Sequence, residues 1–234
     1  MVGATADRPR VWVNCAASLD GRLAFAHGAR ARLSGPEDLA RVHRLRAESD
    51  AILVGVGTVV LDDPSLRVDP SLVKSLPARP PTRVVVDASG RTPEGARFLD
   101  GSVPTIVATT DRNPRAYPPH VRVVRAGGET VDLAQLFGLL RELGLVRLMV
   151  EGGSRILASV ARDGLFDRWT IYYAPVFIGD ASAPPLVGGE VVLRPPDLVR
   201  LRLESVERLG EGYLASFTPQ VPRARPDVPG SVQA

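Results

Sequence analysis

The sequence predicts an α/β fold in which a mostly parallel central sheet is flanked by helices and closed by a C-terminal antiparallel hairpin. Short apolar runs of strand length alternate with amphipathic segments of helix length, which is typical of parallel strands joined by helical crossovers. Two strand-like segments at 201–208 and 213–217 flank Gly210-Glu211-Gly212, which indicates a hairpin. We expect one domain over residues 10–218. Flexible tails are expected at 1–9 and 219–234, which are rich in proline, glycine and small polar residues and show no periodicity.

Each expected strand is a short, mainly apolar run with turn residues at its end. Asp20-Gly21 supplies the turn after the first run, and glycines follow the second and the last of the central runs. Valine and isoleucine are frequent in these runs and favour the extended conformation. In chain order, the strands before the hairpin are expected at 11–17, 50–55, 83–87, 103–109, 121–124, 146–150 and 169–176.

Each expected helix has a recognisable start or stop signal. Ser34 is a candidate N-cap of the first helix, because Pro36 and the acids Glu37 and Asp38 suit a first helical turn. The second helix is amphipathic and stops at Gly144. The helices are expected at about 36–49, 133–143 and 155–163. The proline-rich stretch 63–81 predicts an irregular loop, and such long loops are usually functional.

Single residue counts exclude several mechanisms. Cys15 is the only cysteine, so the chain can form neither an internal disulfide nor a multi-thiolate zinc site. The three histidines lie far apart without metal-binding spacing, so we expect no metal site. Lys74 is the only lysine and lies in a proline-rich connection, which argues against a Schiff-base mechanism. The sequence also lacks the Gly-Lys-Ser/Thr of a P-loop.

The charge balance favours neither a nucleic-acid-binding nor a membrane protein. The chain has 29 basic and 26 acidic side chains, a formal net charge of +3, and its arginines are interleaved with acids. Aromatic residues make up 5% of the chain, too few for stacking platforms that bind single-stranded nucleic acid. We find no run near the roughly 18 apolar residues of a membrane span and no signal peptide, so a cytoplasmic location is expected.

Polar residues at the strand ends predict a large, phosphate-bearing ligand, because ligands of such sheets bind beyond the carboxyl ends of the strands. Glu151-Gly152-Gly153-Ser154 is the strongest case. Glycines between a strand and a helix let the backbone approach a pyrophosphate, which the helix N-terminus then binds. Gly55-Val56-Gly57-Thr58 is a weaker case of the same turn. Both segments are also compatible with simple turns, and neither is the GxGxxG fingerprint of a Rossmann dehydrogenase.

Four residues that follow the third and fourth strands suggest which nicotinamide cofactor would bind. Ser89, Arg91, Thr109 and Arg112 could receive a ribose 2′-phosphate, which would favour NADPH over NADH. Ordinary loop polarity explains these residues equally well, so the residues alone leave both interpretations open.

Six short segments occur in a characteristic order. They are Asn14-x-Ala16-x-Ser18-Leu19-Asp20-Gly21-Arg22, His43-x-Leu45-Arg46-Ala47, Asp50-Ala51-Ile52-Leu53-Val54-Gly55-x-Gly57-Thr58-Val59, Asp62-Asp63-Pro64-x-Leu66, Arg83-Val84-Val85-Val86-Asp87 and Glu151-Gly152-Gly153. In these segments the chain resembles the pyrimidine reductases of riboflavin biosynthesis, which share the dihydrofolate-reductase-like fold. The resemblance covers about residues 10–218.

The resemblance implies NADPH-dependent reduction of the ribosyl group of a ribosylamino-pyrimidine phosphate to ribityl, by hydride transfer to an imine carbon of the ring-opened sugar. It also implies a homodimer. By position, Asn14 and Glu151 are candidate catalytic residues. Asn14, Arg46, Leu66, Arg67 and Glu151 are candidate substrate contacts, with both arginines suited to the 5′-phosphate and Glu151 to pyrimidine amino groups. Together with the strand-end residues above, the candidate cofactor contacts are Ala17, Gly57, Thr58, Asp62, Val86, Asp87, Ala88, Ser89, Arg91, Thr109, Gly152, Gly153, Ser154 and Arg155.

Two branches of the resembled family differ in substrate. The bacterial branch usually follows a fused zinc deaminase and reduces the deaminated pyrimidine, whereas the archaeal and fungal branch reduces 2,5-diamino-6-ribosylamino-4(3H)-pyrimidinone 5′-phosphate. Asn14, where the bacterial branch commonly has lysine, and the absence of a deaminase segment and its cysteines favour the diamino compound. The alternatives are reduction of 5-amino-6-(5-phosphoribosylamino)uracil, a folate-type reductase and a noncatalytic nucleotide sensor.

Overall fold

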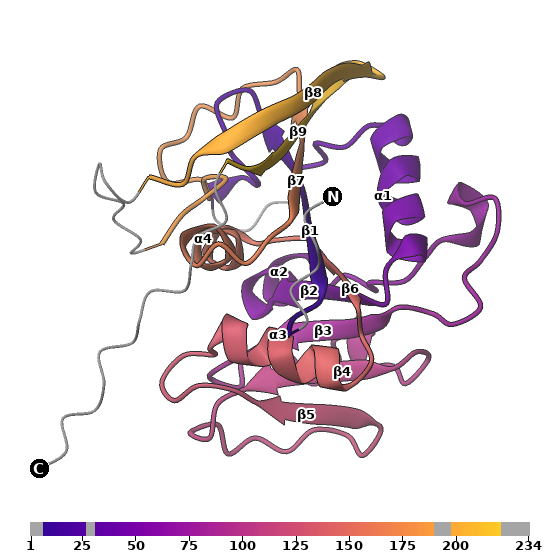
Figure 1. Cartoon of the computed structure of the whole chain (residues 1–234), viewed down its shortest axis with the longest axis vertical. Helices are drawn as coiled ribbons and strands as arrows, with labels where there is room; N and C mark the ends of the chain where they lie inside the picture. The colour runs from indigo at the N-terminus through magenta and orange to yellow at the C-terminus, as the bar shows by residue number, and fades with distance from the viewer. Residues whose placement is uncertain (1–6, 27–30, 190–197, 221–234) are drawn as a thin grey trace, which may run out of the picture.

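A single nine-stranded sheet runs through the residues that the computed structural model describes, which are 7–26, 31–189 and 198–220 (Figure 1). The strand order is β5-β4-β3-β2-β6-β1-β7-β9-β8, with β1 to β7 parallel and β9 and β8 antiparallel, which confirms the predicted fold class. The elements are β1 (Arg10–Ser18), α1 (Pro36–Glu48), β2 (Ala51–Gly55), α2 (Val56–Asp62), η2 (Pro70–Leu72), β3 (Thr82–Val86), η3 (Arg97–Leu99), β4 (Thr105–Thr109), β5 (Val121–Arg125), α3 (Leu133–Glu142), β6 (Arg147–Val150), α4 (Ser154–Arg162), β7 (Arg168–Ala174), β8 (Leu201–Leu209) and β9 (Gly212–Pro219).

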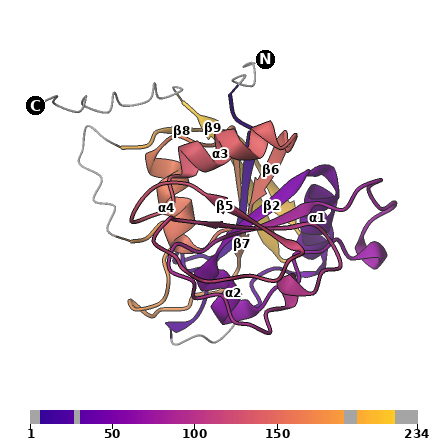
Figure 2. The same ribbon diagram turned by 90° about the horizontal axis from the view of Figure 1, so that it is seen from below.

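Helices cover both faces of the sheet because the chain reverses its direction across it. From β1 to β5 the chain moves one way through the strand order, and from β5 through β6 to β7 it returns. Since parallel crossovers are right-handed, the reversal places α3 and α4 on the face opposite α2 (Figure 2). The core agrees, because Leu53 packs with residues of α3 and α4, whereas its neighbours Ile52 and Val54 pack with α2.

The position of β6 creates the place where a ligand can bind. β6 lies between β1 and β2, and its last residue, Val150, pairs with Val13 and with Leu53. The next residue, Glu151, therefore leaves the sheet between β1 and β2, beyond the carboxyl end of β6 and close to that of β2. In open α/β sheets this reversal point is where ligands bind.

Two local predictions were wrong. Gly55-Val56-Gly57-Thr58 was expected to be a turn, but residues 56–62 form α2, because Val56 and Val59 are buried against the sheet. Gly35, not Ser34, is the N-cap of α1, and the Ser34 hydroxyl instead donates to the Asp38 carboxylate at 2.5 Å. No boundary of the other expected strands and helices differs from the observed one by more than two residues. Most of both predicted tails (1–6 and 221–234) lies outside the described residues.

Candidate active site

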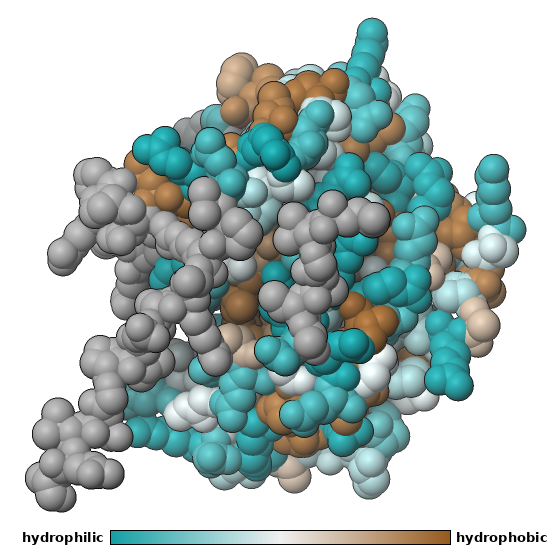
Figure 3. Space-filling model, in the orientation of Figure 1, coloured by the Kyte–Doolittle hydropathy of each residue, from teal (hydrophilic) through white to brown (hydrophobic). Residues whose placement is uncertain are grey.

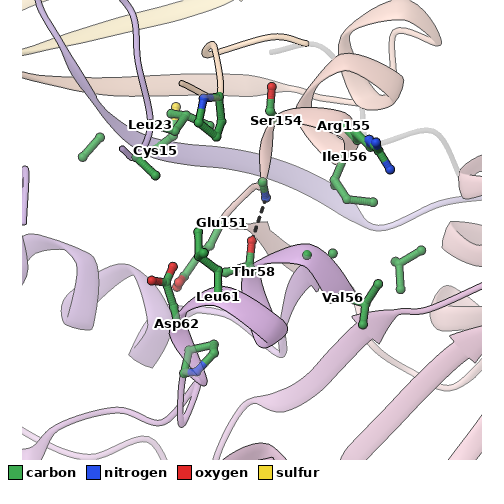
Figure 4. A pocket seen from close by; sticks show the side chains of 18 of the residues that line it. Cys15, Leu23, Val56, Thr58, Leu61, Asp62, Glu151, Ser154, Arg155 and Ile156 are labelled. Atoms are coloured by element: carbon green, nitrogen blue, oxygen red, sulfur yellow. Dashed lines mark hydrogen bonds between the residues drawn. The ribbon is translucent and has the colours of Figure 1, made fainter. Parts of the chain in front are cut away.

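A cavity of about 1050 Å³ opens beyond the carboxyl ends of the parallel strands (Figure 4). Residues after β2, β3 and β6 line it, together with the end of β1 and residues 31–34 before α1. The sheet reversal explains its position, since neighbouring strand ends diverge there. Its volume is at the upper end of the usual range for small-molecule sites, roughly 300–1,000 Å³, so it has room for two ligands of moderate size.

Glu151 and Arg46 form a bidentate ion pair in the wall of this cavity. Arg46 Nε donates to Glu151 Oε1 at 2.6 Å, and Nη2 donates to Oε2 at 2.7 Å. Both side chains are largely buried, with 14% and 12% of their surface exposed. Burial lowers the pKa of Arg46, but the charge and hydrogen bonds of Glu151 outweigh it, so the pKa lies above its ordinary value. Two predicted substrate contacts therefore bind each other through two parallel hydrogen bonds, the bidentate geometry in which arginine binds a carboxylate.

The same turn of α1 also hydrogen-bonds to the segment 66–69, which contains the predicted substrate contacts Leu66 and Arg67. Arg46 Nη1 donates to the Arg67 carbonyl at 3.0 Å, and the Asp69 N–H donates to His43 Nδ1 at 2.9 Å. Leu66 is buried with a left-handed backbone (φ 51°). The Arg67 side chain points elsewhere, because it lines a second cavity of about 240 Å³ and lies 3.7 Å from Asp100.

The glycine turn after β6 brings backbone to the cavity wall. Gly152 has a φ of 97°, a conformation that L side chains rarely adopt. The Gly153 N–H donates to Thr58 Oγ1 at 3.1 Å, shown as the dashed line in Figure 4. A Cβ on Gly153 would lie 3.0 Å from that oxygen. Gly153 is the N-cap of α4 and supplies no side-chain cap, and the first residues of the helix, Ser154 and Arg155, line the cavity.

The structure brings most of the predicted residues to this cavity. The lining includes the predicted substrate contacts Arg46 and Glu151 and the predicted cofactor contacts Gly57, Thr58, Asp62, Val86, Ala88, Arg91, Gly153, Ser154 and Arg155. Predicted residues outside the lining are Asn14, Ala17, Leu66, Arg67, Asp87, Ser89, Thr109 and Gly152.

Asp87 and Thr109 have local partners instead. The buried Asp87 carboxylate accepts the N–H groups of Arg91 and Thr92 at 3.0 and 2.8 Å, and Thr109 Oγ1 donates to the Asp87 carbonyl at 2.8 Å. These bonds shape the loop that carries Arg91. The exposed Arg112 pairs with Glu129 at 2.7 Å.

Sequence reasoning missed two cations of the cavity, Arg32 and Arg97. Arg32 precedes α1, and Arg97 begins η3, where the structure places it by a 2.7 Å bond from its N–H to Asp63 Oδ1. Neither follows a strand, so no strand-end signal marks them. With Arg46, Arg91 and Arg155, five arginines line the cavity against two acids, Asp62 and Glu151. The excess of positive charge suits anionic ligands.

The described residues offer neither a cluster of metal ligands nor an ionised thiol. Among the described residues, no group of three or more His, Cys, Asp or Glu side chains could hold a metal ion. Cys15 lines the cavity, but burial raises the pKa of its thiol to about 12, so it stays protonated. No helix of the described ranges is long and apolar enough to cross a membrane.

Comparison with known proteins assigns the chain to a family. The sequence model of the RibD C-terminal domain matches residues 9–215. The chain belongs to the RibD C-terminal domain family. Among its members, two archaeal relatives, from Archaeoglobus fulgidus and Methanothermobacter thermautotrophicus, are each 41% identical over 215 residues. The matches cover 88% and 90% of this chain and 96% and 98% of those proteins, and both relatives are named 2,5-diamino-6-ribosylamino-4(3H)-pyrimidinone 5′-phosphate reductase.

Solved structures of this family have the same fold. RibD of Acinetobacter baumannii superposes with a TM-score of 0.76 at 25% identity over 92% of this chain, which spans 58% of that longer protein. The riboflavin biosynthesis reductase Rib7 of Saccharomyces cerevisiae superposes with a TM-score of 0.72 at 24% identity. The match covers 94% of this chain and 93% of Rib7. The expected family and fold are thus confirmed.

Proposed function

We propose that the protein is an NADPH-dependent reductase that converts the ribosyl side chain of 2,5-diamino-6-ribosylamino-4(3H)-pyrimidinone 5′-phosphate to the ribityl form. The observation that carries the proposal is the cavity at the sheet reversal, which joins a glycine turn before a helix to a buried Arg46–Glu151 fork. Two relatives that match nearly the whole chain carry the name of this activity.

The residues on the α4 side of the cavity fit a dinucleotide. The open N-terminus of α4 offers N–H groups to a pyrophosphate, Gly153 leaves room for close approach, and Arg155 adds a cation. Arg91 lies beyond β3 on the same cavity and can receive a further phosphate at the adenosine end. A nicotinamide bound here would supply the hydride.

The residues on the α1 side fit the pyrimidine phosphate. The Glu151 carboxylate, held by Arg46, can accept from amino groups of the pyrimidine while its charge stays balanced. In the reduction, a hydride adds to C1′ of the imine and a proton to its nitrogen, which leaves the ribityl amine. The protein's part is to orient the two ligands and to exclude water.

Turnover assays distinguish this proposal from its rivals. The purified protein is incubated with NADPH and, in separate reactions, the diamino pyrimidine phosphate, the deaminated 5-amino-6-(5-phosphoribosylamino)uracil and dihydrofolate. We expect NADPH oxidation with the diamino compound at a kcat/KM above that of the other two. A higher kcat/KM for the uracil or for dihydrofolate would reassign the substrate, and no oxidation with any of them would refute a reductase.

We also propose that the protein is a homodimer. β8 is an edge strand, and its Leu201, Leu203 and Val206 are 37%, 55% and 56% exposed. β8 lies at the top of Figure 1, and Figure 3 shows apolar side chains at this end of the molecule. An apolar edge strand favours pairing with a second copy. Light scattering should give twice the chain mass of 25.0 kDa, and Val206→Lys should shift the mass toward one chain. A wild-type mass of one chain would contradict the proposal.

A further inference from the structure

The side chain of Asn14 is held by two donors behind the cavity wall. Arg41 Nη2 donates to Asn14 Oδ1 at 2.6 Å, and Thr170 Oγ1 donates to the same oxygen at 2.9 Å. Asn14 is 5% exposed, and the next two residues, Cys15 and Ala16, line the cavity. The contacts come from α1 and β7, so the tertiary fold sets the position of this amide.

Two donors at one atom determine which way the amide points. A guanidinium N–H can only donate, so the atom beside Arg41 has to be the carbonyl oxygen of Asn14. The nitrogen Nδ2 is then turned away from both partners. It donates to no other residue in the described part of the chain, although Asn14 is nearly buried. Nδ2 is not among the buried side-chain atoms that lack a partner, so it keeps access to solvent and is free to donate to a ligand that accepts a hydrogen bond.

Arg41 is itself held rigidly. Its Nε and Nη2 donate to Asp38 Oδ1 at 2.9 and 2.7 Å, and only 1% of the Asp38 side chain is exposed. The other Asp38 oxygen accepts from Ser34 at 2.5 Å, and Ser34 lines the cavity. The path from Ser34 through Asp38 and Arg41 therefore starts at the cavity wall and ends at Asn14, which precedes the lining residues Cys15 and Ala16. Two bonds to the buried Asp38 thus anchor the guanidinium that donates to Asn14.

We propose that Arg41 is a positioning residue for substrate recognition, which holds Asn14 so that Nδ2 donates to a hydrogen-bond acceptor of the pyrimidine. The inference rests on the proposed function. The acceptor is a ring nitrogen or a carbonyl oxygen, because Nδ2 carries no lone pair for an amino group to bind. On one pyrimidine, Glu151 would then accept a hydrogen bond from an amino group, and Asn14 would donate one to a ring nitrogen or a carbonyl oxygen.

Two conservative substitutions test this role. Asn14→Asp keeps an oxygen for Arg41 and Thr170 but replaces the Nδ2 donor by an acceptor. Arg41→Lys keeps the charge, but an ammonium cannot hold Asp38 and Asn14 with the geometry of a fork. The matched control is Arg44→Lys, the same change at an exposed position of α1. For each variant we would measure KM and kcat with the pyrimidine phosphate, Kd for NADPH and the melting temperature.

The proposal expects a substrate-specific effect. Asn14→Asp should raise KM about tenfold and Arg41→Lys about threefold to tenfold, the range expected for one hydrogen bond. The NADPH Kd and the Arg44→Lys enzyme should match the wild type, and Asn14→Asp should melt no lower than the wild type. An unchanged KM in Asn14→Asp, or an equal rise in the NADPH Kd, would overturn the proposal. Failure of the proposed function would show instead as a wild-type enzyme without turnover.

Discussion

At the scale of single residues, the Arg46–Glu151 fork sets the charge and orientation of the acid on the proposed substrate side of the cavity. Both carboxylate oxygens of Glu151 already accept from Arg46, and the guanidinium also donates to the Arg67 carbonyl. The acid is thus held in one orientation, and any ligand group that binds Glu151 meets a neutral pair. Because the pair is largely buried, removing one charge leaves the other without compensation.

Glu151→Gln tests the fork. The amide keeps the size of the side chain but places an NH2 group against one Arg46 donor. We expect substrate affinity or turnover to fall about tenfold or more, and the free energy of unfolding to fall by about 1–3 kcal/mol. The NADPH Kd should stay the same, because Glu151 is proposed to contact the pyrimidine and not the cofactor. Steady-state kinetics, cofactor titration and urea unfolding give the three quantities.

Arg46→Lys is the companion to Glu151→Gln. Lysine keeps the charge but loses the fork, so substrate binding should weaken while NADPH affinity stays nearly unchanged. A loss of NADPH affinity instead would assign Arg46 to the cofactor. A Glu151→Gln enzyme with wild-type kcat and KM would remove Glu151 from the site.

The sequence predicted Arg46 and Glu151 as single candidate residues of the site. It did not predict that the two side chains form an ion pair. Glu151 and Arg46 were each predicted from the motifs around them. Their contact joins residues 105 positions apart, and it depends on β6 being inserted between β1 and β2, which no local pattern encodes. Arg97 was missed for a similar reason, because a hydrogen bond to Asp63 brings it to the cavity from a loop without a strand-end signal.

At the scale of elements, strong local patterns predicted the strands and the longer helices but did not predict α2. Its sequence combines a glycine with three valines, all of low helix propensity, so the residues favour a turn or a strand. Burial of Val56 and Val59 against the sheet stabilises the helix instead. Tertiary packing outweighs propensity in so short an element.

The N-terminus of α4 gives a prediction about cofactor binding. In Gly153→Val, the Cβ would lie 3.0 Å from Thr58 Oγ1, and the branched side chain would occupy the space in front of the helix N–H groups. NADPH binding should therefore be lost while the far-ultraviolet circular dichroism spectrum stays that of the folded enzyme. The control is Gly95→Ala, where a Cβ meets nothing within 4 Å. Retained NADPH affinity in Gly153→Val would place the pyrophosphate elsewhere.

His43 on α1 makes the stability of the site depend on pH. Burial, then the charge of Arg46, lowers its pKa below the ordinary 6.5, and its Nδ1 accepts the Asp69 N–H. Between the folded pKa and 6.5 the unfolded chain binds more protons than the folded chain. The stabilisation is therefore present above pH 6.5 and is lost as the pH falls through the folded pKa.

His43→Asn isolates this term, because the asparagine oxygen can accept the Asp69 N–H without titrating. We expect the free energy of unfolding to fall with decreasing pH just below 6.5 in the wild type, and less steeply in the variant. Denaturant unfolding at a series of pH values measures both slopes. Identical slopes would mean that other groups carry the dependence.

At the scale of the whole molecule, the modest net charge conceals an uneven distribution. The chain has a formal net charge of +3, and the cavity alone is lined by five arginines and two acids. Arg32, Arg91, Arg97 and Arg155 form no ion pair with another residue that the structure describes. Composition suggested a mixed surface, and the fold gathers these cations at one place. This excess of positive charge favours ligands that carry several negative charges.

Cofactor choice follows from this charge. NADPH carries one phosphate more than NADH, and one charge-assisted contact to it contributes about 1.5–3 kcal/mol, so NADPH should bind at least about tenfold more tightly. Arg91→Met should bring the two Kd values together, whereas Arg122→Met, at an exposed position of β5 outside the cavity, should not. Raising the ionic strength should weaken NADPH binding more than NADH binding, because the additional contact is electrostatic. Fluorescence titrations of both cofactors with the wild type and with the Arg91→Met, Arg122→Met and Arg97→Met variants measure these ratios. Equal wild-type affinities would refute the preference, and a ratio that Arg97→Met but not Arg91→Met abolishes would move the phosphate to η3.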